Sequence, residues 1–118
     1  MDASTEWTFF AECAIPKDVN ELLIEGEVPG MAVKTIRDCA IFTNKRLIVR
    51  DSQGITGKKA EIYSLPWKSV NMWSTENSGH LDLSAEIELW TRAGYIKINL
   101  RKGADVRKID HLIAQSVL

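Results

Sequence analysis

The chain has 118 residues, a formal net charge of −1, and a composition that is 45% hydrophobic and 26% charged. This length suits one domain with a core of its own, and the ordinary apolar fraction excludes a disordered chain. The 15 basic and 16 acidic side chains give no overall attraction to nucleic acid, and no apolar run approaches the roughly 20 residues that cross a bilayer.

The first 16 residues are predicted to form an arm, separate from a domain that covers residues 17–118. They open with an acidic sequence rather than the basic start of a secretory signal, so a cytoplasmic location is expected. Trp7, Phe9 and Phe10 follow neither a helical nor a strand period. We expect this apolar arm either to be disordered or to dock on a neighbouring chain, because it should not remain in water.

A short helix is predicted after Pro16. Asp18 and Glu21 have the spacing of a capping box, in which the two side chains satisfy the exposed N–H groups of the first turn. Gly26 is expected to end this helix.

From Met31 onward the apolar period is two, which is typical of strands. The clearest case is residues 81–89, where apolar and polar side chains alternate strictly, as in a half-buried antiparallel strand. Residues 95–101 repeat the pattern after Ala93 and Gly94, so the two segments are predicted to form a hairpin. Shorter runs with strand character cover residues 31–37, 39–43, 46–51, 59–65 and 70–75.

The last segment changes to helical spacing, with Asp105 placed to cap its start. Its apolar residues are Val106, Ile109, Leu112, Ile113 and Val117. A lone helix with one apolar stripe must lie on a sheet. The sequence therefore predicts a mainly β fold: a bent antiparallel barrel or sandwich of about seven strands, a closing C-terminal amphipathic helix and a short N-terminal helix.

Several multi-residue motifs follow one another in the order of a known family. They are residues 34–38 (KTIRD), 42–48 (FTNKRLI), 51–59, 64–70 (SLPWKSV), 76–79 and 81–86. Together they resemble the bacterial pleckstrin-homology (PH) domains, with Trp67 where a tyrosine is usual. The resemblance implies a PH-like fold of seven strands with a C-terminal helix, no settled biochemical role, and self-assembly, often into rings.

Five basic residues near predicted strand ends form a candidate anion- or lipid-binding rim: Arg37, Lys45, Arg46, Lys58 and Lys59. In eukaryotic PH domains such a rim grips inositol phosphates through charge-assisted hydrogen bonds. Acidic residues are interleaved with this rim, so solvated charge on strand ends is the favoured interpretation. The segment 54–59 (GITGKK) has only two residues between its glycines, where a phosphate-binding P-loop has four, and is predicted to be a turn.

The titratable residues do not predict catalysis. His80 and His111 lie far apart without ligands at metal-site spacing, so no metal or cofactor is expected. Cys13 and Cys39 form no C-x-x-C pair and are interpreted as idle or buried thiols. Two glutamates of the 81–89 strand lie on its polar side, whereas a catalytic acid needs desolvation. The chain is therefore not expected to be an enzyme.

The tryptophans favour an interface. By alternation Trp90 shares a face with Glu86 and Glu88, while Trp73 lies with the polar residues of its own segment, so both are predicted to face outward. Exposed aromatic surface marks binding sites. Two alternatives stay open: each tryptophan caps the core, or a bulge shifts the alternation by one. The candidate oligomer interface comprises Trp73, Glu86, Glu88 and Trp90, with Trp7, Phe9 and Phe10 of the arm.

The leading hypothesis is a non-catalytic interaction module that assembles with copies of itself, most simply into a closed ring. The alternative is a domain that binds a peptide at a strand edge, or a membrane headgroup at the basic rim. Either function leaves room for another protein or peptide as a partner.

Overall fold

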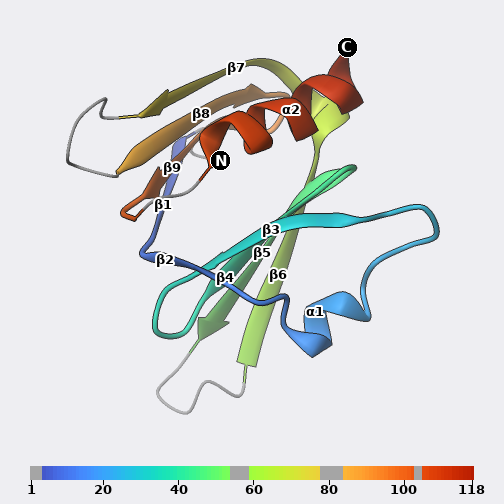
Figure 1. The fold of residues 1–118 in the computed structure, drawn as a ribbon, viewed down its shortest axis with the longest axis vertical. Coiled ribbons are helices and arrows are strands. Elements are labelled where there is room, and N and C mark those ends of the chain that lie inside the picture. Colours follow the sequence, from blue (N-terminus) through green and yellow to red (C-terminus); the bar gives the residue numbers. More distant parts are fainter. Residues whose placement is uncertain (1–3, 54–58, 78–83, 103–104) are drawn as a thin grey trace.

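The computed structural model describes residues 4–53, 59–77, 84–102 and 105–118. Within these ranges nine strands form two sheets (Figure 1). The four-stranded sheet has the order β1-β9-β8-β7, with β1 at Ser4–Phe9, β7 at Val70–Asn77, β8 at Ala85–Thr91 and β9 at Gly94–Leu100. The five-stranded sheet has the order β2-β3-β4-β5-β6, with β2 at Ala11–Cys13, β3 at Pro29–Lys34, β4 at Cys39–Thr43, β5 at Arg46–Gln53 and β6 at Lys59–Pro66.

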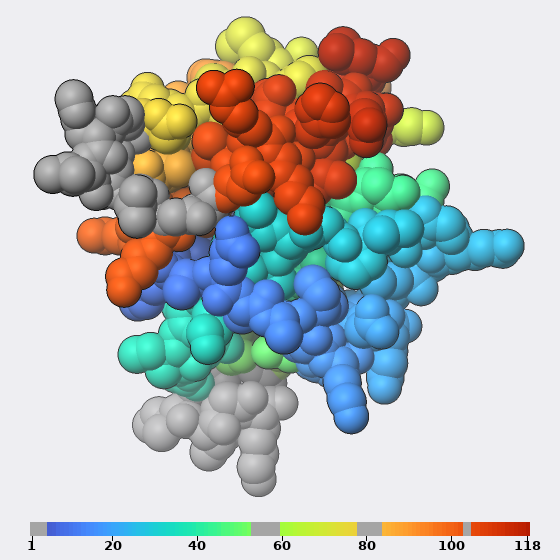
Figure 2. Space-filling view, in the orientation of Figure 1, coloured from blue at the N-terminus to red at the C-terminus, as the bar shows by residue number. Residues whose placement is uncertain are grey.

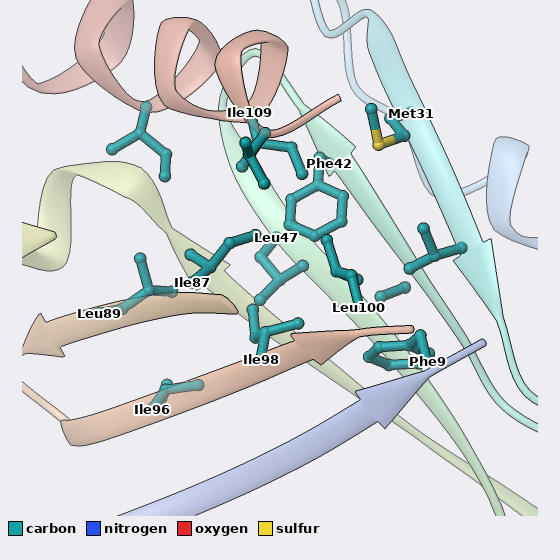
Figure 3. Close-up of a cluster of buried hydrophobic side chains, with 14 of the residues drawn as sticks. Phe9, Met31, Phe42, Leu47, Ile87, Leu89, Ile96, Ile98, Leu100 and Ile109 are labelled. Carbon is teal, nitrogen blue, oxygen red and sulfur yellow. The ribbon is translucent and has the colours of Figure 1, made fainter. Parts of the chain in front are cut away.

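The main core lies between the two sheets because each sheet turns one apolar face inward. Ile87 and Leu89 of β8, and Ile98 and Leu100 of β9, are at most 2% exposed (Figure 3). They meet Phe42 and its neighbours from the five-stranded sheet. Period-two alternation thus produces a sandwich, and the predicted mainly β fold is confirmed.

Helix α2 (Val106–Val117) closes one end of the sandwich (Figure 1). As predicted, the Asp105 side chain caps it by accepting a hydrogen bond from the Lys108 N–H at 3.2 Å. Ile109 and Ile113 are fully buried in the core. The short 3-10 helix η1 (Trp67–Ser69) links the two sheets beneath α2, and Trp67 is fully buried there with its indole N–H donated to the Thr43 carbonyl at 2.7 Å.

The N-terminal segment is part of the domain, so the prediction of a separate arm is wrong for residues 4–13. β1 pairs in parallel with β9, and β2 pairs with β3 in the other sheet. One continuous segment therefore joins both sheets. Phe9 is 2% exposed and belongs to the main core. The sequence does not indicate β1 as a strand, because its partner β9 lies about ninety residues later and this pairing leaves no local periodicity.

The predicted short helix exists as α1, but it covers only Lys17–Asn20 and begins after Pro16 without a side-chain cap. The capping box is therefore wrong. Asp18 instead forms an ion pair with Arg50 of β5, while Val19 is fully buried against the outer side of the five-stranded sheet. The Asp18 carboxylate, which the sequence spacing predicts to cap the helix, takes part in a tertiary ion pair instead.

The predicted alternation of buried and outward side chains is confirmed in the described part of the 81–89 strand. Ala85, Ile87 and Leu89 are buried, and β8 pairs with β9 as the predicted hairpin. Gly94 adopts a φ of 121°, in the region that favours glycine, at the turn. Residues 81–83 lie outside the described ranges.

Candidate interaction surface

The four-stranded sheet presents a continuous outer face, whose composition follows from strand register. Trp90 lies opposite Tyr95 and Met72, Glu88 opposite Lys97 and Ser74, and Glu86 opposite Asn99 and Glu76. Residues directly opposite in antiparallel strands share a face. We define the outer face by Met72, Ser74, Glu76, Glu86, Glu88, Trp90, Tyr95, Lys97 and Asn99.

Trp73 is not on this face, so the prediction that it faces outward is wrong. A register shift between Val70 and Met72 reverses the alternation of β7. Trp73 therefore lies opposite Leu89 on the inner side, packs against the core and donates its indole N–H to Asp110 of α2 at 2.7 Å. Met72 takes the outward position and is 55% exposed. One of the alternatives left open by the sequence, a bulge, is the correct one.

Glu86, Glu88 and Trp90 do lie together on the outer face, as predicted, and all three are half-buried. The Trp90 and Tyr95 rings are in tilted contact, with centroids 5.5 Å apart. Glu88 is held by two hydroxyl donors, Tyr95 at 2.6 Å and Ser74 at 3.2 Å. Its hydrogen bond from Tyr95 is the main cause that raises the pKa of Tyr95 to about 12. Glu88 thus anchors the Tyr95 hydroxyl, and the Tyr95 ring packs on Trp90.

The aromatic residues of the N-terminal segment are dispersed. Phe9 is in the core and is not available for an interface within this fold. Trp7 lies opposite Ile98 on the inner side and contacts the Tyr63 ring, with centroids 5.9 Å apart. Phe10, between β1 and β2, is 49% exposed. Of the seven residues predicted for the interface, Glu86, Glu88 and Trp90 lie together on one face.

Of the predicted basic rim, the three members whose side chains the structure describes do not lie together. Arg37 lies in the turn between β3 and β4, whereas Lys45 and Arg46 lie at the β4–β5 turn, at the opposite end of the same strands (Figure 1). Arg46 is also committed to Glu27, which accepts from its Nε at 2.9 Å and its Nη2 at 3.0 Å. Lys58 falls outside the described residues, and Lys59 is described only as the first position of β6.

Histidine and cysteine positions give no metal-site geometry. His111 is exposed on α2, His80 falls in a stretch the structure does not describe, and among described residues no three His, Cys, Asp or Glu side chains converge. Cys13 and Cys39 are both unbonded thiols on the outer side of the five-stranded sheet. Burial raises the pKa of both thiols, although Arg50 acts in the opposite direction.

Sequence reasoning missed Met72 and Tyr95 on the outer face. Tyr95 could have been found, because a hairpin that turns at Arg92 and Ala93 places it opposite Trp90. Met72 could not, because strand alternation alone does not reveal a bulge.

Two sheets with a C-terminal helix across one end define a PH-like β-sandwich. Comparison with known proteins bears this out. The bacterial PH domain family matches residues 3–117, and the chain belongs to that family.

Two of the similar proteins have solved structures. A PH-domain protein of the DUF1696 family from Shewanella loihica PV-4 is 35% identical, with a TM-score of 0.77 over 92% of this chain and 97% of the other. A PH domain from Shewanella amazonensis SB2B is 36% identical, with a TM-score of 0.62 over 86% of this chain and 83% of the other.

An uncharacterized protein of Bacillus subtilis strain 168, YjqA, is 46% identical over 77 residues, or 65% of this chain. The chain spans 62% of the length of that relative. Within the described ranges, no helix combines the length and apolar character needed to cross a membrane.

Proposed function

We propose that this PH domain is a non-catalytic interaction module that assembles with copies of itself through the outer face of the four-stranded sheet. The observation that carries the proposal is the outward cluster of Met72, Trp90 and Tyr95. Helix α2 and the second sheet lie on the other side of this sheet, where Trp73 bonds Asp110. The outer face is thus left to solvent or to a partner.

The composition of the outer face suits a protein partner. Trp and Tyr are the residue types that most often dominate interface energies, and Met adapts to the surface it meets. Here the Tyr95 hydroxyl is hydrogen-bonded to Glu88 and the Tyr95 ring packs on Trp90, which lowers the conformational entropy that Tyr95 loses on binding. Glutamates surround this cluster, and Lys97 pairs with one of them, Glu86. Together they form a polar rim that would set the orientation of a bound partner.

A second copy of the chain is the partner that we propose, with a closed ring as the assembly. The outer face carries Glu76, Glu86 and Glu88 but one lysine, so it does not complement itself in charge across a two-fold axis. A head-to-tail contact with a different, more basic surface of the next copy avoids this repulsion. Head-to-tail contacts between identical chains close into rings when the rotation permits.

Sedimentation velocity over a concentration series tests the surface. Met72→Glu adds a carboxylate to the acidic outer face and is expected to weaken association about tenfold or more. Ile62→Glu is the matched control, because Ile62 is a 44% exposed apolar residue on β6 of the other sheet. The proposal fails if Met72→Glu associates like the parent chain, or if only Ile62→Glu dissociates.

A further inference from the structure

Strand β7 has one free edge, because it is the outermost strand of its sheet and pairs only with β8 (Figure 1). Arg92, just beyond β8, donates its N–H to the Ser69 carbonyl at 3.0 Å, so the even-numbered residues of β8 turn their backbone groups toward β7. They lie opposite the even-numbered residues of β7. The backbone N–H and C=O groups of two odd-numbered residues, Trp73 and Thr75, therefore point to the free edge.

This edge is open to another strand. Among the described residues, no backbone hydrogen bond joins Trp73 or Thr75 to an element other than β8. Proteins usually protect such edges with lysine, proline or a bulge. β7 contains neither lysine nor proline, and its register shift lies at its start, between Val70 and Met72. The rest of β7 thus presents backbone donors and acceptors that match those of an added strand.

A cavity of about 560 Å³ opens beside this edge, between β7 and α2. Its described lining consists of Thr75 and Asn77 from β7, and of Val106, Arg107, Asp110 and His111 from α2. Figure 2 shows the two elements side by side, with β7 in yellow and α2 in orange-red. Asp110 accepts the Trp73 indole N–H at 2.7 Å, so the two walls of the cavity are linked directly.

The helical wall of the cavity favours an acidic ligand. Arg107 and His111 lie one turn apart on the exposed side of α2. Within the described ranges Arg107 forms no ion pair. Asp110 is the one carboxylate in the described lining, and it already accepts a hydrogen bond from Trp73. The Arg107 guanidinium is therefore left with its donors available to an acidic side chain.

We propose that the free edge of β7 binds an extended acidic peptide of another protein, which adds to the sheet as a further strand. The backbone groups of Trp73 and Thr75 hold the main chain of the peptide. Every second side chain of an added strand points to the same side of the sheet, so those on the α2 side meet Arg107. Acidic residues at alternate positions are thus the preferred pattern. The site is separate from self-association, because these three residues do not belong to the outer face.

Backbone amide NMR of the full chain, titrated with an acetylated hexapeptide of alternating glutamate and valine, tests the site. Saturable shifts are expected at residues 73–77 and 106–111, and a peptide of alternating lysine and valine should not produce them. Thr75→Pro removes an N–H that takes no part in the pairing with β8, and should weaken binding about tenfold. Thr75→Val keeps this N–H and is the matched control, with binding like that of the parent chain.

The charged wall is tested in the same titration. Arg107→Glu should weaken binding of the glutamate peptide about fivefold. Lys108→Glu is the matched control, because Lys108 is an exposed neighbour on α2 that lines a different cavity, and it should change binding little.

Absence of saturable shifts, equal binding of the lysine peptide, or equal effects of Thr75→Pro and Thr75→Val overturns the inference. Should Thr75→Pro fail to fold, the comparison of Arg107→Glu with Lys108→Glu decides it. Light scattering of folded Thr75→Pro separates the edge from self-association. An unchanged mass supports a peptide site, whereas a mass below that of the parent chain assigns the edge to a second copy and overturns the inference.

Discussion

Arg46 closes on Glu27 as a bidentate pair, with Nε to Oε2 at 2.9 Å and Nη2 to Oε1 at 3.0 Å. The Glu27 side chain is fully buried, and it also accepts from the Thr43 hydroxyl at 2.7 Å and the Ile24 N–H at 3.1 Å. Arg46 reaches further, to the Leu22 carbonyl at 2.8 Å. The Glu27 carboxylate thus links the connection between α1 and β3 to the β4–β5 turn through these hydrogen bonds.

Glu27→Gln is therefore expected to lower the free energy of unfolding by roughly 2 kcal/mol, because charge-assisted hydrogen bonds are lost inside the protein. Urea unfolding followed by circular dichroism measures the loss. Glu25→Gln, an exposed glutamate in the same connection, is the control and should change stability little. Equal stability of the two variants would contradict the structural role assigned to Glu27.

The same pair predicts a pH dependence. Burial alone would raise the pKa of Glu27, but the hydrogen bonds from Arg46 and Thr43 outweigh it and hold the pKa below its ordinary value. A depressed folded-state pKa stabilises the protein above the ordinary value, and this stabilisation is lost as the pH falls through the folded value. The stability difference between parent and Glu27→Gln should be full near neutrality and shrink below about pH 4.5. A difference that is constant with pH would rule out this explanation.

Gly30 of β3 permits the close approach of α2. A Cβ at this position would lie 2.8 Å from Leu112 Cδ1 and 3.3 Å from the Phe42 carbonyl oxygen. Gly30→Ala is therefore expected to destabilise the fold by about 1–3 kcal/mol through overpacking. Leu112→Ala should cost less in the Gly30→Ala background than in the parent, because it removes the clash. Additive costs in thermal or urea unfolding would show that the helix does not press on Gly30.

Local patterns determined much of this fold in advance. The alternation of residues 85–89 and the helical stripe after Asp105 are visible in sequence because burial repeats at a fixed period. The separation of Arg37 from Lys45 was also accessible, since a strand of five residues lies between them.

Other features depend on contacts that no local pattern encodes. β1 and its partner β9 lie near opposite ends of the sequence, so no local pattern indicates that Trp7 and Phe9 belong to a strand. The bulge in β7 moved Trp73 inward and Met72 outward. The ion pair between Arg50 and Asp18 joins β5 to α1, and this requires the tertiary structure.

Light scattering of the full chain at high micromolar concentration tests self-assembly most directly. The account predicts a mass that is a whole-number multiple, greater than one, of the 13.3 kDa subunit. A single species of 13.3 kDa at that concentration would contradict it and leave the outer face without a role in assembly.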